Sequence, residues 1–133
     1  MCSILHWTPT DTGDANYEIV IVGAGAGGIA AAASLKARKP GIEIAIIDPA
    51  DIHYYQPGWT MVGGGIFEPE QTSRTMGSLI PRGVHWIKAA VAAFEPEKNA
   101  IILDGCRVVK YKRMIVCPGL KLDWNKIGGL VDT

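Results

Sequence analysis

The residues with the clearest potential for chemistry are six consecutive glycine and alanine residues near the N-terminus. Residues 23–28 read Gly-Ala-Gly-Ala-Gly-Gly and contain the pattern G-x-G-x-x-G at Gly23, Gly25 and Gly28. An acidic residue, Asp48, stands 20 positions after Gly28. This combination is typical of a dinucleotide site, in which a pyrophosphate lies at a helix N-terminus and the acid accepts hydrogen bonds from ribose hydroxyls.

Each glycine of this pattern has its own expected role. Gly23 permits the tight turn, Gly25 lets the backbone approach a pyrophosphate, and Gly28 lets the helix lie close to the sheet. Asp48 would repel a 2′-phosphate, so a nucleotide without that phosphate is expected. The candidate contacts at the turn are Gly23, Gly25, Ala26, Gly27 and Gly28. The alternative is that these glycines only shape a tight junction between a strand and a helix.

The elements on either side of the pattern are those that a dinucleotide site requires. Residues 17–22 form a β-branched apolar run that predicts a buried strand of a parallel sheet, and residues 43–48 predict a second one. Between them, residues 27–39 are rich in alanine and predict a helix, which Pro40 and Gly41 end. Strand, glycine turn, helix and strand within roughly thirty residues make a βαβ unit.

The remainder of the chain predicts a mainly β structure. Residues 1–16 are polar and rich in turn formers, and we expect a flexible leader there, before a domain at residues 17–133. Residues 53–69 are expected to be irregular, and residues 72–79 to form a short helix. Strands are expected at residues 84–94, 100–103, 107–109 and 114–117, with turns at residues 97–99 and 104–105. The fold class is therefore α/β, with a Rossmann-like βαβ unit, a parallel sheet and an antiparallel β-meander.

Composition and charge exclude several classes of function. The 133 residues include 13 basic and 13 acidic ones, so no excess charge favours nucleic acid as a partner. No stretch reaches the roughly 20 apolar residues of a transmembrane helix, and the N-terminus does not resemble an export signal. Cys2, Cys106 and Cys117 lack the spacing of a zinc site or a disulfide scaffold, so we expect free thiols and no metal ligands.

Two further segments resemble parts of known flavoproteins. Residues 53–65 read His-Tyr-Tyr-Gln-Pro-Gly-Trp-Thr-Met-Val-Gly-Gly-Gly and closely resemble the segment after the ribose-binding acid in sulfide:quinone oxidoreductases. Residues 114–119 resemble the flavin-adjacent strand of flavoproteins with two dinucleotide-binding domains, although only Gly119 matches its usual Ala-Thr-Gly ending. Residues 49–81 contain no cysteine, so the glutathione reductase-like branch, with its Cys-x4-Cys pair, is excluded. The resemblance to sulfide:quinone oxidoreductases extends from Tyr17 to the last residue.

This resemblance implies a cofactor and a reaction. The cofactor is FAD, with the glycine turn at its phosphates, Asp48 at its ribose, Gln56 and Gly119 near its flavin, and the backbone of Val91 at its adenine. Gln56 is also a polar residue within an apolar loop, where a buried amide would need a partner. In its full-length form the protein would oxidise sulfide and reduce quinone. The cysteine pair for that reaction would lie downstream of this chain, so no catalytic residue is assigned within it.

The resemblance also implies that the chain is an incomplete domain. An unpaired edge of the sheet would then make the isolated chain inactive and weakly stable, or a homo-oligomer. The chain itself is expected to be soluble, with peripheral contact to a bacterial cytoplasmic membrane through a missing C-terminal region. Two alternatives stay open: a fragment resembling type II NADH:quinone oxidoreductases, and a nucleotide-binding module without catalysis.

Overall fold

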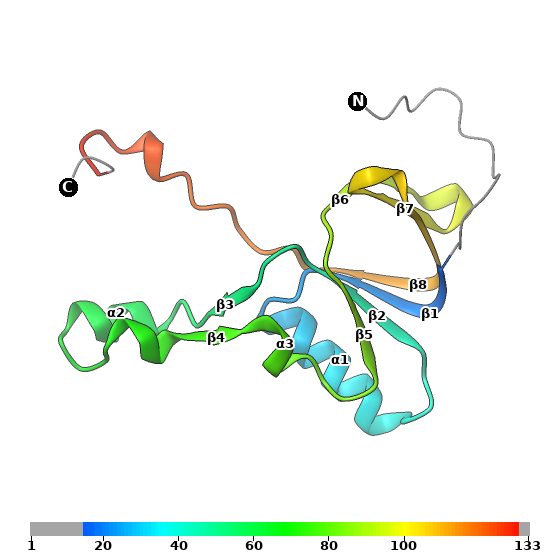
Figure 1. Ribbon diagram of the computed structural model, residues 1–133, viewed down its shortest axis with the longest axis horizontal. Coiled ribbons are helices and arrows are strands. Elements are labelled where there is room, and N and C mark those ends of the chain that lie inside the picture. Colours follow the sequence, from blue (N-terminus) through cyan, green and yellow to red (C-terminus); the bar gives the residue numbers. More distant parts are fainter. Residues whose placement is uncertain (1–14, 131–133) are drawn as a thin grey trace.

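The computed structural model describes residues 15–130 and contains two β-sheets with helices against them (Figure 1). The large sheet has the strand order β5-β2-β1-β8-β7-β6. Its strands are β1 (Ala15–Val22), β2 (Ile44–Ile47), β5 (Val84–Ile87), β6 (Val91–Glu95), β7 (Ala100–Leu103) and β8 (Val108–Val116). The small sheet pairs β3 (Ile52–Tyr54) with β4 (Ser73–Thr75). The helices are α1 (Ala26–Arg38), α2 (Gly58–Gly63) and α3 (Met76–Leu79), with short 3-10 turns at Pro69–Thr72, Pro96–Lys98, Asp104–Cys106 and Trp124–Lys126.

Strand β8 joins the parallel and antiparallel parts of the large sheet. It pairs in parallel with β1 along its length, from Ala15 opposite Val109 to Val22 opposite Val116. Near its start, it also pairs antiparallel with β7. Strands β5, β2 and β1 are parallel to one another, while β6, β7 and β8 form the meander. The expected α/β fold, with a parallel sheet and an antiparallel β-meander, is confirmed.

Several expected boundaries differ from the structure. The two strands expected at residues 107–109 and 114–117 are one strand, β8, because pairing with β1 continues through the polar residues between them. The strand expected at residues 84–94 is two, β5 and β6, because the chain leaves the parallel sheet and enters the meander between them. Strand β1 begins at Ala15, two residues earlier than expected. Residues 1–14 of the expected leader lie outside the described residues.

The segment expected to be irregular contains regular structure. Strand β3 and helix α2 lie within or next to residues 53–69, and the helix expected at residues 72–79 is shortened to α3 because β4 precedes it. Figure 1 shows α2, β3 and β4 as an arm that projects from the large sheet, on the same side as the segment after β8. None of the helices within residues 15–130 combines the length and apolar character needed to cross a bilayer.

The large sheet carries a hydrophobic core on each face. On one face, α1 contributes Ala32, which packs with Ile21 and Ile46 of the parallel strands. On the other face, Ile101 and Leu103 of β7 pack with residues of β1, β2, β5 and β8, so the curled sheet covers itself with its own meander. Burial on both faces explains why residues 19–22 of β1 and all of β2 are continuous apolar runs rather than alternating ones.

The buried side chains of the meander are expected to contribute to the stability of the whole domain. Replacing Ile101, which is 0% exposed, with alanine should lower the free energy of unfolding by about 3 kcal/mol. The control is Phe94→Ala on the adjacent strand, where the ring is 45% exposed and the expected loss is below about 1 kcal/mol. Urea denaturation followed by circular dichroism measures both values, and equal losses would contradict the packing described.

Candidate dinucleotide-binding groove

Three backbone segments meet where β1 ends. Gly23 has a φ of +99°, and its amide donates a hydrogen bond to the carbonyl of Ile47 at 2.8 Å. A Cβ atom on Gly23 would lie 2.3 Å from the carbonyl oxygen of Cys117, and one on Gly28 would lie 1.9 Å from the carbonyl oxygen of Gly23. Real Cβ atoms do not approach backbone oxygens so closely. The structure therefore requires glycine at both positions for the contact between β1, α1 and the end of β8.

Gly25 differs from these two glycines. Its φ of −70° and ψ of −173° are ordinary extended values, and a Cβ atom on it would meet nothing within 4 Å. It is the N-cap of α1, but no side chain forms a capping hydrogen bond there, and no acidic residue lies in the first helical turn. The amides at a helix start have no partners within the helix and attract anions. Within residues 15–130, neither backbone conformation nor packing requires a glycine here.

Asp48 is held firmly beside this turn, directly after β2. Its Oδ2 accepts a hydrogen bond from the amide of Ala24 at 2.8 Å, and its Oδ1 accepts one from the amide of Ala50 at 2.8 Å. Its backbone carbonyl accepts a hydrogen bond from the indole nitrogen of Trp86 at 3.0 Å. A carboxylate offers about four acceptor positions, so these contacts orient Asp48 without using all of them. The supporting role of Trp86 was missed from the sequence, where only the general need of a buried indole N–H for an acceptor points to it.

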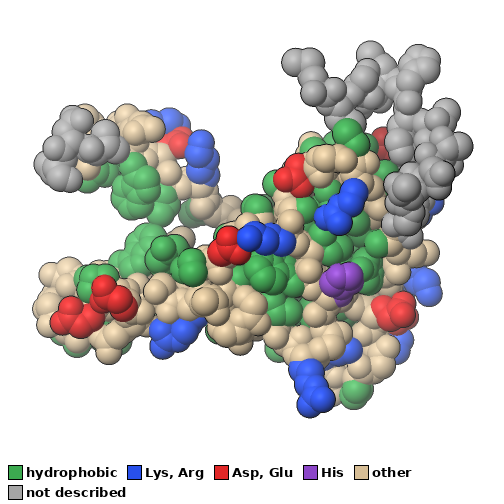
Figure 2. All heavy atoms as spheres, viewed as in Figure 1, with side chains coloured by type: hydrophobic (Ala, Val, Ile, Leu, Met, Phe, Trp, Pro, Cys, Tyr) green, Lys and Arg blue, Asp and Glu red, His purple; other side chains and the backbone are tan. Residues whose placement is uncertain are grey.

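A groove of about 610 Å³ runs from the glycine turn to the projecting arm. This volume is within the range of pockets that hold small ligands and cofactors. Figure 2 shows hydrophobic side chains on both the arm and the C-terminal segment, facing each other across a hollow. The groove brings together five residues expected from the sequence, namely Gly25, Ala26, Asp48, Gln56 and Gly119.

The far end of the groove is lined by apolar and aromatic side chains that remain exposed. Tyr54 is 53% exposed, Tyr55 is 58% exposed and Leu120 is 88% exposed. The rings of Tyr54 and Trp59 contact each other edge to face, with centroids 6.2 Å apart. The side chain of Gln56 is exposed as well, so its expected need for an internal hydrogen-bond partner does not arise. This end therefore offers an open apolar surface beside the polar glycine turn.

Four expected site residues do not line the groove. Gly23 and Gly28 are buried where the turn meets α1, and Gly27, in the first turn of α1, is exposed but is not among the lining residues. Val91 begins β6, where it pairs with Leu103 and packs against the core between the sheet and the meander. Its contact with an adenine stays a prediction.

Cys117 lies behind the glycine turn. Its Sγ is 3.7 Å from the carbonyl oxygen of Gly23, a weak hydrogen bond in which the thiol is the donor. Burial raises the pKa of the Cys117 thiol, so the neutral form is favoured and a nucleophilic thiolate is not. The structure thus agrees with a packing role for this residue. Cys106 is disulfide-bonded, which contradicts the free thiol expected there, and Cys2 lies outside the described residues.

Most of the chain is similar in sequence to known proteins. Residues 17–129 match the family model described as pyridine nucleotide-disulphide oxidoreductase. The chain is 40% identical over 126 residues to the mitochondrial sulfide:quinone oxidoreductase of Mus musculus, covering 95% of this chain and 28% of that protein. It is also 40% identical over 114 residues to the mitochondrial sulfide:quinone oxidoreductase of Dictyostelium discoideum, covering 85% of this chain and 25% of that protein.

A solved structure shows the same fold. The sulfide:quinone oxidoreductase of Aquifex aeolicus superimposes with a TM-score of 0.71 at 23% identity, over 81% of this chain and 25% of that one. The resemblance to sulfide:quinone oxidoreductases is thereby confirmed. The chain spans about a quarter of the length of the curated relatives it matches.

The glycines of the turn should separate into two classes when each is replaced by alanine. Gly28→Ala forces a methyl group onto a backbone oxygen and should lower the free energy of unfolding by about 3 kcal/mol. Gly25→Ala places its methyl group in open space, so the free energy of unfolding should change by less than about 1 kcal/mol. The weaker N-cap of alanine lowers the stability, and the less flexible unfolded chain raises it by a similar amount. Urea denaturation of both variants checks this ranking. A loss at Gly25 as large as that at Gly28 would show that packing alone selects both glycines.

Proposed function

Because the chain belongs to the pyridine nucleotide-disulphide oxidoreductase family, we propose that it carries an FAD site of a protein that oxidises sulfide and reduces quinone. The observation that supports FAD as the cofactor is the open space at Gly25. Among the described residues nothing requires a glycine at this position, and the position opens on a groove beside a helix N-terminus without a side-chain cap. A dinucleotide pyrophosphate fits that combination of close approach and unpaired amides.

The residues present fit the rest of such a cofactor. The amides of Gly25 and Ala26 would bind the phosphates, and Asp48 would accept hydrogen bonds from the adenosine ribose. Gln56 and Gly119 would lie along the flavin, where the groove is aromatic and apolar. A site that is polar at one end and apolar at the other suits FAD better than NAD, because the flavin ring system is larger and less polar than nicotinamide.

The proposed reaction derives from the named relatives. When bound, the cofactor would accept two electrons from sulfide and pass them to quinone. Within residues 15–130, the side chains of this chain would bind and orient the cofactor and exclude water from one of its sides. No catalytic residue is proposed, because Cys117 has its thiol directed at a backbone carbonyl and its pKa raised by burial.

Three further expectations stay predictions. These are a peripheral contact with a bacterial cytoplasmic membrane, a homo-oligomer, and a cysteine pair outside this chain. A fragment resembling type II NADH:quinone oxidoreductases is the alternative enzyme, and it is not favoured by the relatives at 40% identity. The second alternative is a nucleotide-binding module without catalysis. It has the same proposed FAD site, and an assay of sulfide oxidation by a longer protein would distinguish it from the enzyme.

The proposal predicts saturable binding of FAD to the whole chain, followed by quenching of flavin fluorescence. Asp48→Asn should weaken FAD about tenfold or more, because it removes the charge from hydrogen bonds to the ribose. Asp51→Asn is the matched control, since Asp51 is exposed, pairs with Lys88 and does not line the groove. NAD should bind more weakly than FAD.

The controls decide how the result is interpreted. Circular dichroism must show that both variants keep the fold, because Asp48 also accepts hydrogen bonds from Ala24 and Ala50. A folded chain that binds neither nucleotide, or equal weakening in both variants, would contradict the proposed site.

A further inference from the structure

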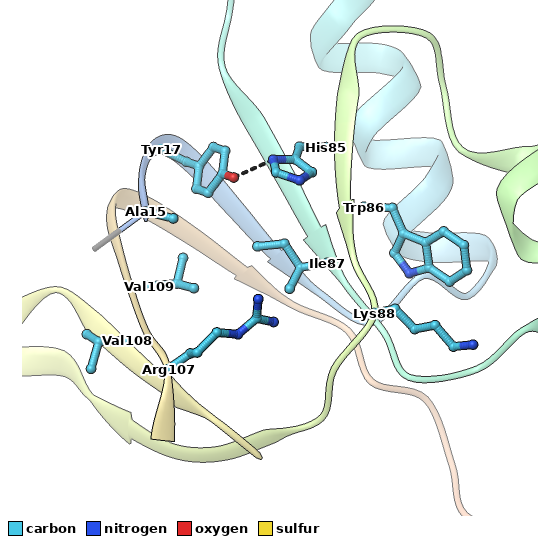
Figure 3. Close-up of a pocket in the computed structure, with 9 residues that line it drawn as sticks. All are labelled: Ala15, Tyr17, His85, Trp86, Ile87, Lys88, Arg107, Val108 and Val109. Atoms are coloured by element: carbon cyan, nitrogen blue, oxygen red, sulfur yellow. Dashed lines mark hydrogen bonds between the residues drawn. The ribbon is translucent and has the colours of Figure 1, made fainter. Parts of the chain in front are cut away.

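A second cavity lies on the face of the large sheet that the meander covers, opposite the face that packs against α1. Its volume is about 260 Å³, and it lies between the start of β1, the strand β5 and the start of β8 (Figure 3). The linings of the two cavities share no residue, although they adjoin at Asp48, which lines the groove and is hydrogen-bonded to Trp86 and to the carbonyl of Ile87. The smaller cavity is therefore distinct from the groove but adjacent to it.

The lining of this cavity is apolar on one side and polar on the other. Ile87 and Val109 are buried core residues at its base. Opposite them, the hydroxyl of Tyr17 is hydrogen-bonded to Nδ1 of His85, with the two rings edge to face and their centroids 5.6 Å apart. Figure 3 shows the guanidinium of Arg107 directed toward Ile87, which lies between it and the phenol–imidazole pair.

The charge of Arg107 is not neutralised by the residues that line the cavity. No aspartate or glutamate is among them. The guanidinium of Arg107 has no ion pair with any residue from 15 to 130, whereas Lys88, the other cation of the lining, is paired with Asp51. Burial and the carboxylate of Glu43 raise the pKa of Tyr17, although Arg107 acts in the opposite direction, so the phenol keeps its proton as a possible donor. The cavity thus presents a cation and hydrogen-bonding groups on either side of apolar side chains.

We propose that this cavity binds a small organic carboxylate. The planar guanidinium of Arg107 suits a carboxylate, which it can bind through two parallel hydrogen bonds. The base of Ile87 and Val109 would contact the apolar body of the ligand. The volume is below the range of about 300–1,000 Å³ typical of drug-sized ligands, which excludes a nucleotide and favours a molecule of a single ring or short chain.

The test is a titration of the isotope-labelled whole chain with benzoate, followed by two-dimensional NMR. Benzamide has the same shape without the charge, and inorganic phosphate has charge without an apolar body. Benzoate should shift the signals of Ile87, Val109 and Tyr17 saturably, and benzamide and phosphate should each bind about tenfold more weakly. This comparison uses the unaltered chain, so it does not depend on the folding of a variant.

Two variants extend the test. Arg107→Gln should weaken benzoate about tenfold, while Arg82→Gln, which alters an exposed arginine outside the cavity, should leave the affinity unchanged. Equal binding of benzoate and benzamide would overturn the role of the cation, and equal binding of phosphate would overturn the role of the apolar base. Equal weakening by both arginine substitutions, or benzoate shifts confined to residues outside the cavity, would overturn the site itself.

Discussion

The contact of three backbone segments at Gly23 is the constraint on which the rest of the structure depends. The end of β1, the start of α1 and the end of β8 approach one another until no Cβ atom fits at Gly23 or Gly28. Hydrogen bonds from Gly23 to Ile47 and from Cys117 to Val22 hold the same point. Since the segment after β8 forms one wall of the groove and the turn forms its floor, this contact sets the relative position of both.

The groove is organised differently at its two ends. At the polar end, Asp48 is oriented by the amides of Ala24 and Ala50 and by the indole of Trp86, so its geometry is fixed before a ligand arrives. At the apolar end, Tyr54, Tyr55 and Leu120 are largely exposed. Contiguous apolar surface of this kind marks a place that a ligand or further protein covers. The polar end would orient a ligand through hydrogen bonds, and the apolar end would stabilise its complex through buried apolar area.

The local parts of this structure could be predicted from the sequence, and the non-local parts could not. The βαβ unit and its glycine pattern depend on neighbouring residues, so the strand, turn and helix, and the place of Asp48 beside the turn, were predicted correctly. The continuity of β8 depends on pairing with β1, and no local pattern across its polar middle indicates it. The sequence does not distinguish Gly23 from Gly25. The carbonyl of Cys117, more than ninety positions away, leaves no room for a Cβ atom on Gly23, whereas no atom approaches a Cβ atom on Gly25. The hydrogen bond between Tyr17 and His85, 68 positions apart, could not be predicted for the same reason, because only the fold brings the two residues together.

The central claim is that the start of α1 is kept open for a pyrophosphate, and NMR spectra of the whole chain with ADP and with adenosine test it most directly. ADP contains the pyrophosphate and ribose of the proposed cofactor, whereas adenosine lacks the phosphates. ADP should shift the amide signals of Gly25, Ala26 and Gly27, and adenosine at the same concentration should not. Equal shifts with both compounds, or ADP shifts confined to residues away from the turn, would contradict it.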